Sequence, residues 1–486
     1  MREDADRVRS IVDALGAADI PVWTDKSRLS PGEDWKLVIR TAIQRNALAF
    51  IAVFSKSSAA RTQSYQNAEL VLAAEQYRLR PPGRPWIIPV RLDECELPEF
   101  DLGAGRTLDS LQRADLFGPD REQEMVRLVT AVLRILGGST ADPAAVRASI
   151  SLAKPEERGA NLAHAVKAML LDPQRQIELE DLVLGEARRT KDAIVDAETF
   201  PDDASQLQTP LAGARWAVAR FRAYATAVEP LSHALATGCA WGSSDQQAIW
   251  TQAVRTIAAT VDELQLGNSY LAAMREYPVH VVVYAAAVGA LSRKNYGALR
   301  AANIDPFVRS RGGRESVIHH LAPYRYLHPF ELAATLLANE SEGKEIPDDK
   351  VQDWSSRGGL RFTPISDALH ALIRPILHDL VPDDTDYTEL FDEVEVLLGV
   401  LAEDSYLYVK DTQNVYLTGG WFGRFTWREQ YASTAPVHRR MEAELKSAGA
   451  AWAPLKAGLF GGSYERAIRA FDSFNASAKR TMNRLH

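Results

Sequence analysis

The chain has 486 residues, and because single hydrophobic cores rarely grow beyond about 250–300 residues, we expect more than one domain. The net charge of −8 provides no overall basic surface for nucleic acid, and the two cysteines exclude a disulfide framework. The start, MREDADRVRS, has no apolar signal region, and the longest apolar run, Pro278–Ser292, is too short to span a bilayer. We therefore expect a cytoplasmic protein without a membrane segment.

Helical and strand patterns alternate over the first 136 residues. The run Ala47–Ser55 is apolar throughout, as expected of a strand buried on both faces of a parallel sheet. Ser, Pro and Gly mark Asp25–Asp34 as a loop. The other predicted elements are helices at 5–18, 35–45, 65–79 and Arg121–Leu136 and strands at Ile20–Trp23 and Pro85–Leu92. Strands that alternate with helices at this spacing predict a parallel α/β sheet.

The segment GGSTADPAA is rich in small and turn-forming residues. It predicts a linker at 137–147, between a first domain at 1–136 and a second domain at 148–486. Helical periodicity dominates the second domain, with helices predicted at 162–171, 176–195, 210–236, 245–265, 279–301, 328–340, 366–379, 387–403, 437–447 and 463–484. A short β-like segment is predicted at Tyr406–Gly420, and no fixed-period repeat supports a solenoid.

Four segments of the first domain occur in an order and at a spacing that are typical of a known protein family. They are EDADRVRSIVDAL, IPVWTDKSRLSPGEDW, AFIAVFSKSSAARTQSYQNAEL and WIIPVRLDECELP. In this order and spacing, the residues from Arg2 to about Phe117 resemble a bacterial Toll/interleukin-1 receptor (TIR) domain. The resemblance implies a parallel sheet of flavodoxin-like order, with an acidic loop carrying a Pro-Gly pair after the second strand and a glutamate on the helix after the third.

The start of the chain departs from this family pattern. Family members begin with a strand and a short loop, often ending in a Ser-Tyr-Ser-like stretch, before the first helix. Here Met1 stands where that loop would be, so the first strand is missing. That strand lies inside a flavodoxin-like sheet, and its loss leaves buried backbone groups unpaired. We expect either that the chain begins further upstream or that the domain is degenerate. The catalytic competence of the domain depends on which of these two alternatives holds.

Glu69 is the candidate catalytic residue. By resemblance, enzymatic TIR domains break the nicotinamide–ribose bond of NAD⁺ with a glutamate at this place, often with an aromatic residue four positions earlier, which here is Tyr65. Cleavage of that bond builds positive charge on the ribose, and a nearby carboxylate stabilises it. Nicotinamide leaves without needing a general acid. Glu75, six residues further on, projects from a different face of the helix and is expected to be dispensable.

Further substrate-binding candidates follow from the fold, because ligands of open α/β sheets bind beyond the carboxyl ends of the strands. The acidic loop and the segment after the third strand supply them: Asp25, Pro31, Gly32, Trp35, Ser55 and Ser57. For any single side chain of the loop an ordinary surface turn is the alternative, and for Trp35 it is packing at a helix start. NAD⁺ is expected as a substrate, with neither a cofactor nor a metal required.

Three other clusters each allow a functional and a structural interpretation. His319–His328 holds three histidines, but prolines interrupt the helix that would align them as metal ligands. Arg309–Arg314 is a basic glycine-containing loop that could hold a phosphate, with a solvated loop as the favoured alternative. Trp421–Arg428 could stack a base, with core packing as the favoured alternative.

These features predict an NAD⁺ glycohydrolase or cyclase that acts as an effector in bacterial antiphage defence or signalling. The α-rich domain is expected to act as a sensor or scaffold that responds to an unidentified ligand or protein and gates activity through TIR self-association. The alternative is a non-enzymatic TIR adaptor that acts through protein–protein contacts.

Overall fold

The computed structural model describes residues 4–18, 20, 22, 49–59, 65–79, 86–103, 105–135, 157–201, 207, 209–262, 269–310, 313–320, 324–357, 360–413, 423–428 and 436–485. The chain divides into two compact units, Met1–Arg158 and Gly159–His486. The predicted linker at 137–147 lies outside the described residues and stays a prediction, as do the two domain limits. Within the described residues, no helix has the length and apolar character needed to cross a membrane.

The first unit contains a parallel sheet with strand order β1-β2-β5. Phe50 pairs with Ile87 and Phe54 with Arg91, and Val90 pairs with Ala114. Strands β3 and β4 form a separate antiparallel pair. The elements are α1 (Ala5–Ala17), β1 (Phe50–Phe54), α3 (Lys56–Ala59), α4 (Tyr65–Arg78), β2 (Ile87–Arg91), β3 (Asp101–Gly103), β4 (Arg106–Thr107), β5 (Ala114–Asp115) and α5 (Arg121–Ile135).

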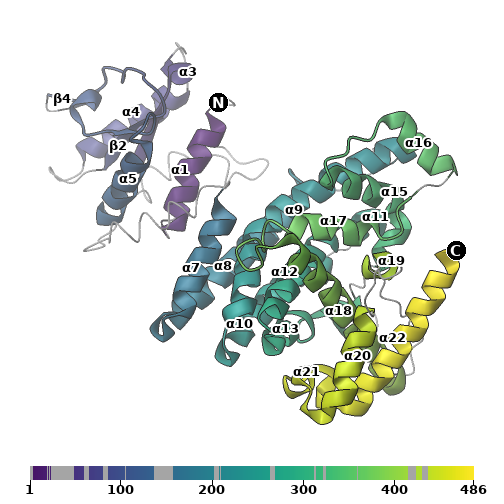
Figure 1. Cartoon of the computed structure of the whole chain (residues 1–486). Coiled ribbons are helices and arrows are strands. Elements are labelled where there is room, and N and C mark those ends of the chain that lie inside the picture. The colour runs from purple at the N-terminus through teal and green to yellow at the C-terminus, as the bar shows by residue number, and fades with distance from the viewer. Residues whose placement is uncertain are drawn as a thin grey trace. The chain divides into compact units, whose positions relative to one another are not determined.

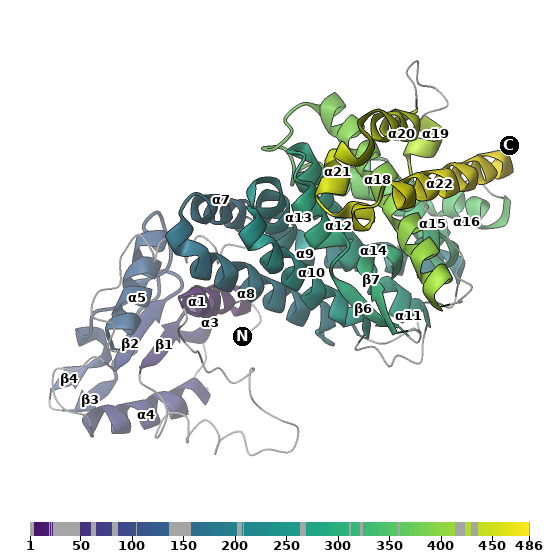
Figure 2. The same ribbon diagram turned by 90° about the horizontal axis from the view of Figure 1, so that it is seen from below.

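Helices cover both faces of this sheet (Figure 2). Residues of α1 and α5 pack with Ile88 and Val90 of β2 on one face. Residues of α4 pack with Ala52 and Phe54 of β1 and with Ile87 of β2 on the other. Because successive strand residues point to opposite faces, the apolar runs of β1 and β2 fill two cores at once. This is the two-sided parallel arrangement that the sequence predicts.

Most of the elements predicted for the first unit are confirmed, within a few residues at their ends. They are the helices α1, α4 and α5 and the strands β1 and β2. Of the predicted strand at Ile20–Trp23 only Ile20 and Val22 are described, and neither is assigned to a strand. The predicted loop Asp25–Asp34 and the helix at 35–45 lie outside the described residues. The short strands β3, β4 and β5 were not predicted, because two or three residues carry too little periodicity.

The second unit is largely helical (Figure 1). Its helices are α7 (Arg158–Leu170), α8 (Gln176–Val195), α9 (Pro210–Trp241), α10 (Gln247–Asp262), α11 (Ser269–Met274), α12 (Tyr277–Ser292), α13 (Tyr296–Asn303), α14 (Val317–His320), α15 (Tyr324–Ser341), α16 (Asp348–Arg357), α17 (Pro364–Ile373), α18 (Asp384–Gln413), α19 (Phe425–Arg428), α20 (Val437–Ala448), α21 (Ala453–Lys456) and α22 (Tyr464–Leu485). A β-hairpin is formed by β6 (Phe307–Ser310) and β7 (Gly313–Ser316).

Helix α12 forms the centre of the second unit. Every residue from Tyr277 to Leu291 is buried, as the unbroken apolar run predicts. Helix α12 packs against α9, α13 and α18 (Figure 1). The backbones of α9 and α12 approach closely at Gly289, where an added Cβ would lie 2.2 Å from the carbonyl oxygen of Ala236. Glycine is therefore required at this crossing.

The structure corrects two predictions in the second unit. The single helix predicted at 279–301 is wrong, because the chain breaks between α12 and α13, where Lys294 has a φ of 53° and Asn295 caps α13 by accepting from the Ala298 N–H. The β-like segment predicted at Tyr406–Gly420 is wrong for residues 406–413, which continue α18; the rest lies outside the described residues. Asp404 and Asp411 of this helix pair with arginines of α22, and tertiary packing overrides the strand propensity of its tyrosines.

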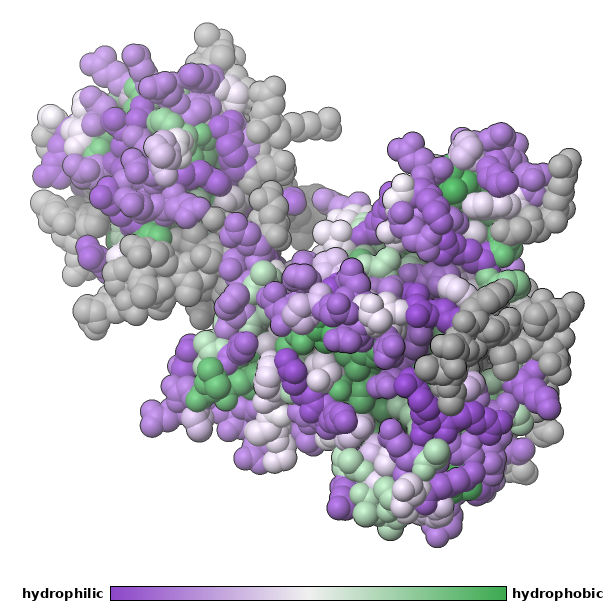
Figure 3. Space-filling model, in the orientation of Figure 1, coloured by the Kyte–Doolittle hydropathy of each residue, from purple (hydrophilic) through white to green (hydrophobic). Residues whose placement is uncertain are grey.

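The visible surface of each unit is mainly hydrophilic, with hydrophobic residues in small patches between charged ones (Figure 3). Leu171 and Ile177, which flank the turn between α7 and α8, are 81% and 76% exposed. Scattered apolar side chains of this kind are normal on a protein surface.

Candidate functional site

Glu69 lies in the second turn of α4. Leu70, Ala73 and Ala74 bury one side of this helix against β1 and β2, whereas Glu75 is exposed. Glu69 itself is half-buried and makes a hydrogen bond or an electrostatic interaction in the domain. The two glutamates of α4 therefore stand in different environments, as their spacing predicts.

A polar cluster lies where β1 and β2 end. It consists of Asp4, Arg7, Ser55, Ser57 and Asp93, and we call it the edge network. Ser55 Oγ donates to Asp4 Oδ2 over 2.6 Å, Ser57 Oγ donates to the same oxygen, and the two hydroxyl oxygens lie 2.9 Å apart. Both views show the start of α1 beside α3, which follows β1 directly (Figures 1 and 2).

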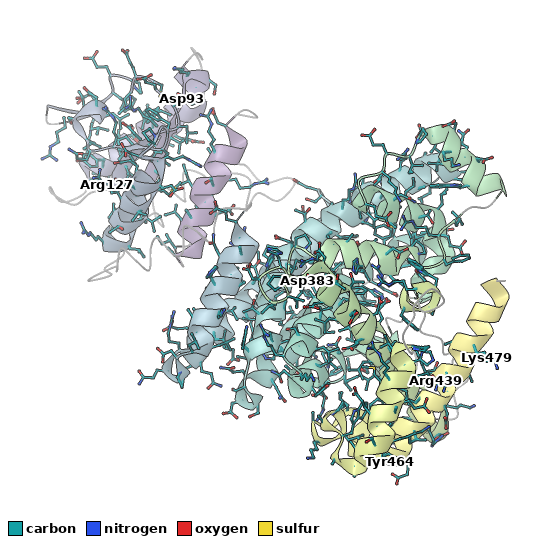
Figure 4. The ribbon with its side chains drawn as sticks, in the orientation of Figure 1. Asp93, Arg127, Asp383, Arg439, Tyr464 and Lys479 are labelled. Atoms are coloured by element: carbon teal, nitrogen blue, oxygen red, sulfur yellow. The ribbon has the colours of Figure 1, made fainter. Side chains whose placement is uncertain are left out.

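Arg7 and Asp93 extend the edge network to the end of β2. Arg7 donates to Asp4 Oδ1, to the carbonyl oxygen of Leu92 at 3.0 Å and to Asp93 at 3.4 Å. Asp93 also accepts from the backbone N–H of Lys56, the first residue of α3, at 2.8 Å. Figure 4 labels Asp93 next to this helix. The network thus joins the start of α1, the end of β1 and the end of β2 in a closed ring.

The edge network holds Asp4 as an anion. Burial alone would raise the pKa of this carboxyl, but hydrogen bonds from Ser55 and Ser57 and the positive charge of Arg7 outweigh burial, so the pKa of Asp4 lies below its ordinary value. Ser55 is 1% exposed and the Asp4 side chain 13% exposed. Solvent therefore screens these interactions less than it screens a surface pair.

A separate ion pair, Arg91–Asp115, lies at the ends of β2 and β5. The Nε and Nη2 atoms of Arg91 each donate to one oxygen of Asp115 over 2.6 Å, and Nη1 donates to the carbonyl oxygen of Cys95 at 2.8 Å. The Arg91 hydrogen bonds outweigh the effect of burial and lower the pKa of Asp115. Such two-point pairing fixes the direction of both side chains.

The structure brings together only part of the predicted site. Ser55 and Ser57 lie in the edge network, and both of their hydroxyl protons are directed to Asp4. Tyr65 opens α4, but its side chain lies outside the described part of the chain. The acidic-loop candidates Asp25, Pro31, Gly32 and Trp35 also lie outside it. Their predicted roles, like that of Glu69, remain predictions.

Sequence reasoning missed Asp4, Arg7 and Asp93. Asp4 resembles an ordinary helix-capping acid, and Asp93 resembles an ordinary loop residue after a strand. Their partners in other segments lie 37 to 86 residues away in the chain. The one available signal was position, since the carboxyl ends of neighbouring parallel strands lie at one edge of the sheet.

The other clusters predicted from the sequence fall in the second unit. Among the residues that the structure describes, no group of three or more His, Cys, Asp or Glu side chains is arranged to hold a metal ion. The side chains of His319, His320 and His328 lie outside that part. The described end of the aromatic cluster packs in the core: Phe425 stacks on Phe474 with ring centroids 5.8 Å apart, and Trp427 Nε1 donates to Thr363 at 2.8 Å. Core packing is confirmed for Phe425, which is 1% exposed, whereas Trp427 is half-buried.

The geometry of the first unit defines a class: a parallel α/β domain whose polar residues gather at the carboxyl edge of the sheet. Residues 1–129 match the family model of the TIR domain, so the chain is a TIR-domain protein with a largely helical second unit. No curated protein matches the chain, and no solved structure does.

Proposed function

We propose that the TIR domain cleaves the nicotinamide–ribose bond of NAD⁺ and that Glu69 is its catalytic carboxylate. The observation that carries this proposal is the TIR match over residues 1–129, with a half-buried glutamate on α4, the second helix after β1. TIR domains are compatible with NAD⁺ hydrolysis, and they commonly self-associate.

The chemistry requires little beyond a positioned carboxylate. As nicotinamide departs, positive charge develops on the ribose, and an anion held against it stabilises the transition state more than the substrate. The leaving group is cationic in NAD⁺ and becomes neutral on departure, so no proton has to be supplied. Water then attacks the ribose to yield ADP-ribose, or a group within the nucleotide attacks to yield a cyclic product.

Nicotinamide release from NAD⁺, measured by chromatography, tests the proposal. Glu69→Gln keeps the size of the side chain and removes its charge, and we expect it to lower turnover by about 100-fold or more. Glu75→Gln makes the same chemical change on the exposed part of the same helix, and its turnover is expected to equal that of the wild type. Equal turnover in the two variants excludes Glu69 as the catalytic group.

We further propose that activity is gated by assembly, because an ungated enzyme would drain NAD⁺ from its own cell. The helical unit would bring TIR domains together in response to infection, which fits an effector of antiphage defence. Tethering alone can raise effective concentrations to about the mM range. Turnover per molecule is therefore expected to rise steeply with protein concentration, in parallel with mass measured by light scattering. Flat turnover from a protein that remains a monomer excludes this mechanism.

The test also decides on the adaptor alternative. A well-folded, assembled protein that releases no nicotinamide would favour a TIR domain that acts only through protein–protein contacts.

A further inference from the structure

We propose that Asp4 is a positioning residue: through Ser55 and Ser57 it fixes the turn of α3, which lies between β1 and α4, and so the place of Glu69. This inference rests on the proposed NAD⁺ cleavage for its kinetic part, and on the edge network for its structural part. Asp4 is not assigned a contact with the substrate.

Asp4 occupies the position before the first residue of α1, where an aspartate ordinarily caps the helix. A capping side chain accepts a hydrogen bond from one of the free N–H groups of the first turn and stabilises the helix. The Asp4 side chain makes no such bond. Its oxygens instead accept from Arg7 on one side and from Ser55 and Ser57 on the other. Asp4 thus forgoes a local interaction for one with a segment about fifty residues away.

The segment that Asp4 holds is short and strongly constrained. Ser55 Oγ accepts from the Ser58 N–H at 3.1 Å, and Ser58 Oγ accepts from the Ser55 N–H at 2.9 Å. These reciprocal bonds close the turn of α3 around the hydroxyl that donates to Asp4. Asp93 accepts from the Lys56 N–H at the same turn. Loss of Asp4 would leave the protons of Ser55 and Ser57 without their acceptor, with Ser55 almost fully buried.

Helix α4 follows this turn after only a few residues. Its far end is anchored separately, because Arg78 donates to the carbonyl oxygens of Leu102 at 3.2 Å and Asp101 at 3.1 Å. The near end carries Glu69, and α3 ends at Ala59, with five residues between it and the start of α4 at Tyr65. A shift of α3 would therefore displace the first turns of α4 more than the last. A displacement of about 1 Å at a reacting group can reduce a rate by about 100-fold.

The first experiment compares Asp4→Asn with wild type in the full chain by nicotinamide release. We expect kcat to fall by roughly 10- to 100-fold and the KM for NAD⁺ to change by less than about threefold, because positioning affects the transition state more than binding. Asp120→Asn changes an exposed acid directly before α5, and it is the matched control that should retain full turnover. Ser57→Ala removes one donor to Asp4 and is the milder variant if Asp4→Asn folds poorly.

A double-mutant cycle separates this role from general stability. If Asp4 acts through Ser57, the effects of Asp4→Asn and Ser57→Ala on kcat are not additive, and the double variant is little slower than Asp4→Asn alone. Unchanged kcat in Asp4→Asn overturns the proposal. Fully additive losses also overturn it, because the two residues would then act independently.

Hydrogen exchange provides a readout that does not depend on activity. In Asp4→Asn, amides at 65–70 should exchange about tenfold faster than in wild type, while those at 71–78 and in α5 should change much less. If the wild type releases no nicotinamide, the proposed function fails and exchange alone decides on Asp4. Faster exchange confined to 65–70 then supports the positioning role, and unchanged exchange there overturns it.

Discussion

Asp4 of the TIR unit and Glu395 of the helical unit are two carboxyl groups whose pKa values are shifted in opposite directions. In the TIR unit, hydrogen bonds and Arg7 outweigh burial and lower the pKa of Asp4. In the helical unit, burial raises the pKa of Glu395 to about 8, although Ser366 donates to it over 2.5 Å and the Tyr284 hydroxyl at 3.3 Å. Asp4 is therefore charged at neutral pH, whereas Glu395 is largely protonated.

This difference separates two uses of a buried acid. The edge network joins three chain segments at the carboxyl edge of a sheet, where a ligand can approach. The Glu395 carboxyl is 0% exposed among α12, α17 and α18, and Gly423 packs so closely that an added Cβ would lie 2.3 Å from Oε2. Polar groups enclosed in this way fix how helices pack, and they serve no reaction at a surface.

The largest effect should come from the helix crossing at the centre of the second unit. Gly289→Ala places a methyl group against the Ala236 backbone, which cannot move aside as a side chain would. We expect the free energy of unfolding to fall by about 3 kcal/mol and the melting temperature, measured by calorimetry, to fall by roughly 4 °C. Gly185→Ala in α8 is the control, because a Cβ there meets nothing within 4 Å. An unchanged melting temperature for Gly289→Ala would show that this core is not closely packed.

The pH dependence of stability should reveal Glu395. Its pKa rises from 4.5 in the unfolded chain to about 8 in the folded one, so the folded state binds the proton more tightly. This contribution is full below pH 4.5 and is lost as the pH rises through about 8, which amounts to about 2 kcal/mol between pH 6 and pH 8. Glu395→Gln should flatten this alkaline decline in denaturant unfolding. An equally steep decline in the variant would contradict the assignment.

His370 should produce the opposite slope. Burial, with the nearby Arg424, Arg428 and Arg374, lowers its pKa from 6.5 to about 3. The folded state therefore keeps this histidine neutral, and its stability contribution is present above pH 6.5 and declines as the pH falls towards 3. Between pH 6.5 and pH 5 we expect a loss of about 1–2 kcal/mol that His370→Gln reduces. If the stability of the wild type and that of His370→Gln declined equally as the pH falls, this would argue against a buried neutral histidine.

The smallest effect is expected in the TIR unit. Asp115→Asn removes the charge that Arg91 contacts at two points, and because the pair is partly exposed we expect a loss of only about 1 kcal/mol. Denaturant unfolding followed at a TIR-unit probe measures it. If Asp115→Asn lowered the free energy of unfolding more than Gly289→Ala does, the order of effects expected for the two units would be reversed.

Local patterns predicted much of the fold. The helix predicted at 176–195 matches α8 residue for residue, and the apolar runs that form β1 and β2 were predicted as strands. The hairpin of β6 and β7 was missed, since its short strands are held by pairing with each other rather than by an apolar pattern. The break at Lys294 was missed, although four polar residues, Ser292 to Asn295, interrupt the apolar pattern there.

The candidate site was predicted less completely. Glu69 and Ser55 follow from the position of a helix and a strand along the chain. Arg7 contacts Leu92 across 85 residues of sequence, and no local pattern encodes that proximity. Asp4 accepts from Ser55 instead of capping its own helix because of the tertiary structure. The spacing of residues along the sequence does not predict this bond.

The most direct test of the account separates NAD⁺ binding from NAD⁺ cleavage in one pair of variants. Glu69→Gln and Glu75→Gln are titrated with NAD⁺ by calorimetry, and nicotinamide release is measured in the same samples. We expect both variants to bind NAD⁺ with a Kd within about threefold of each other, and only Glu75→Gln to release nicotinamide. Release at the same rate from both variants would contradict the claim that Glu69 performs the chemistry.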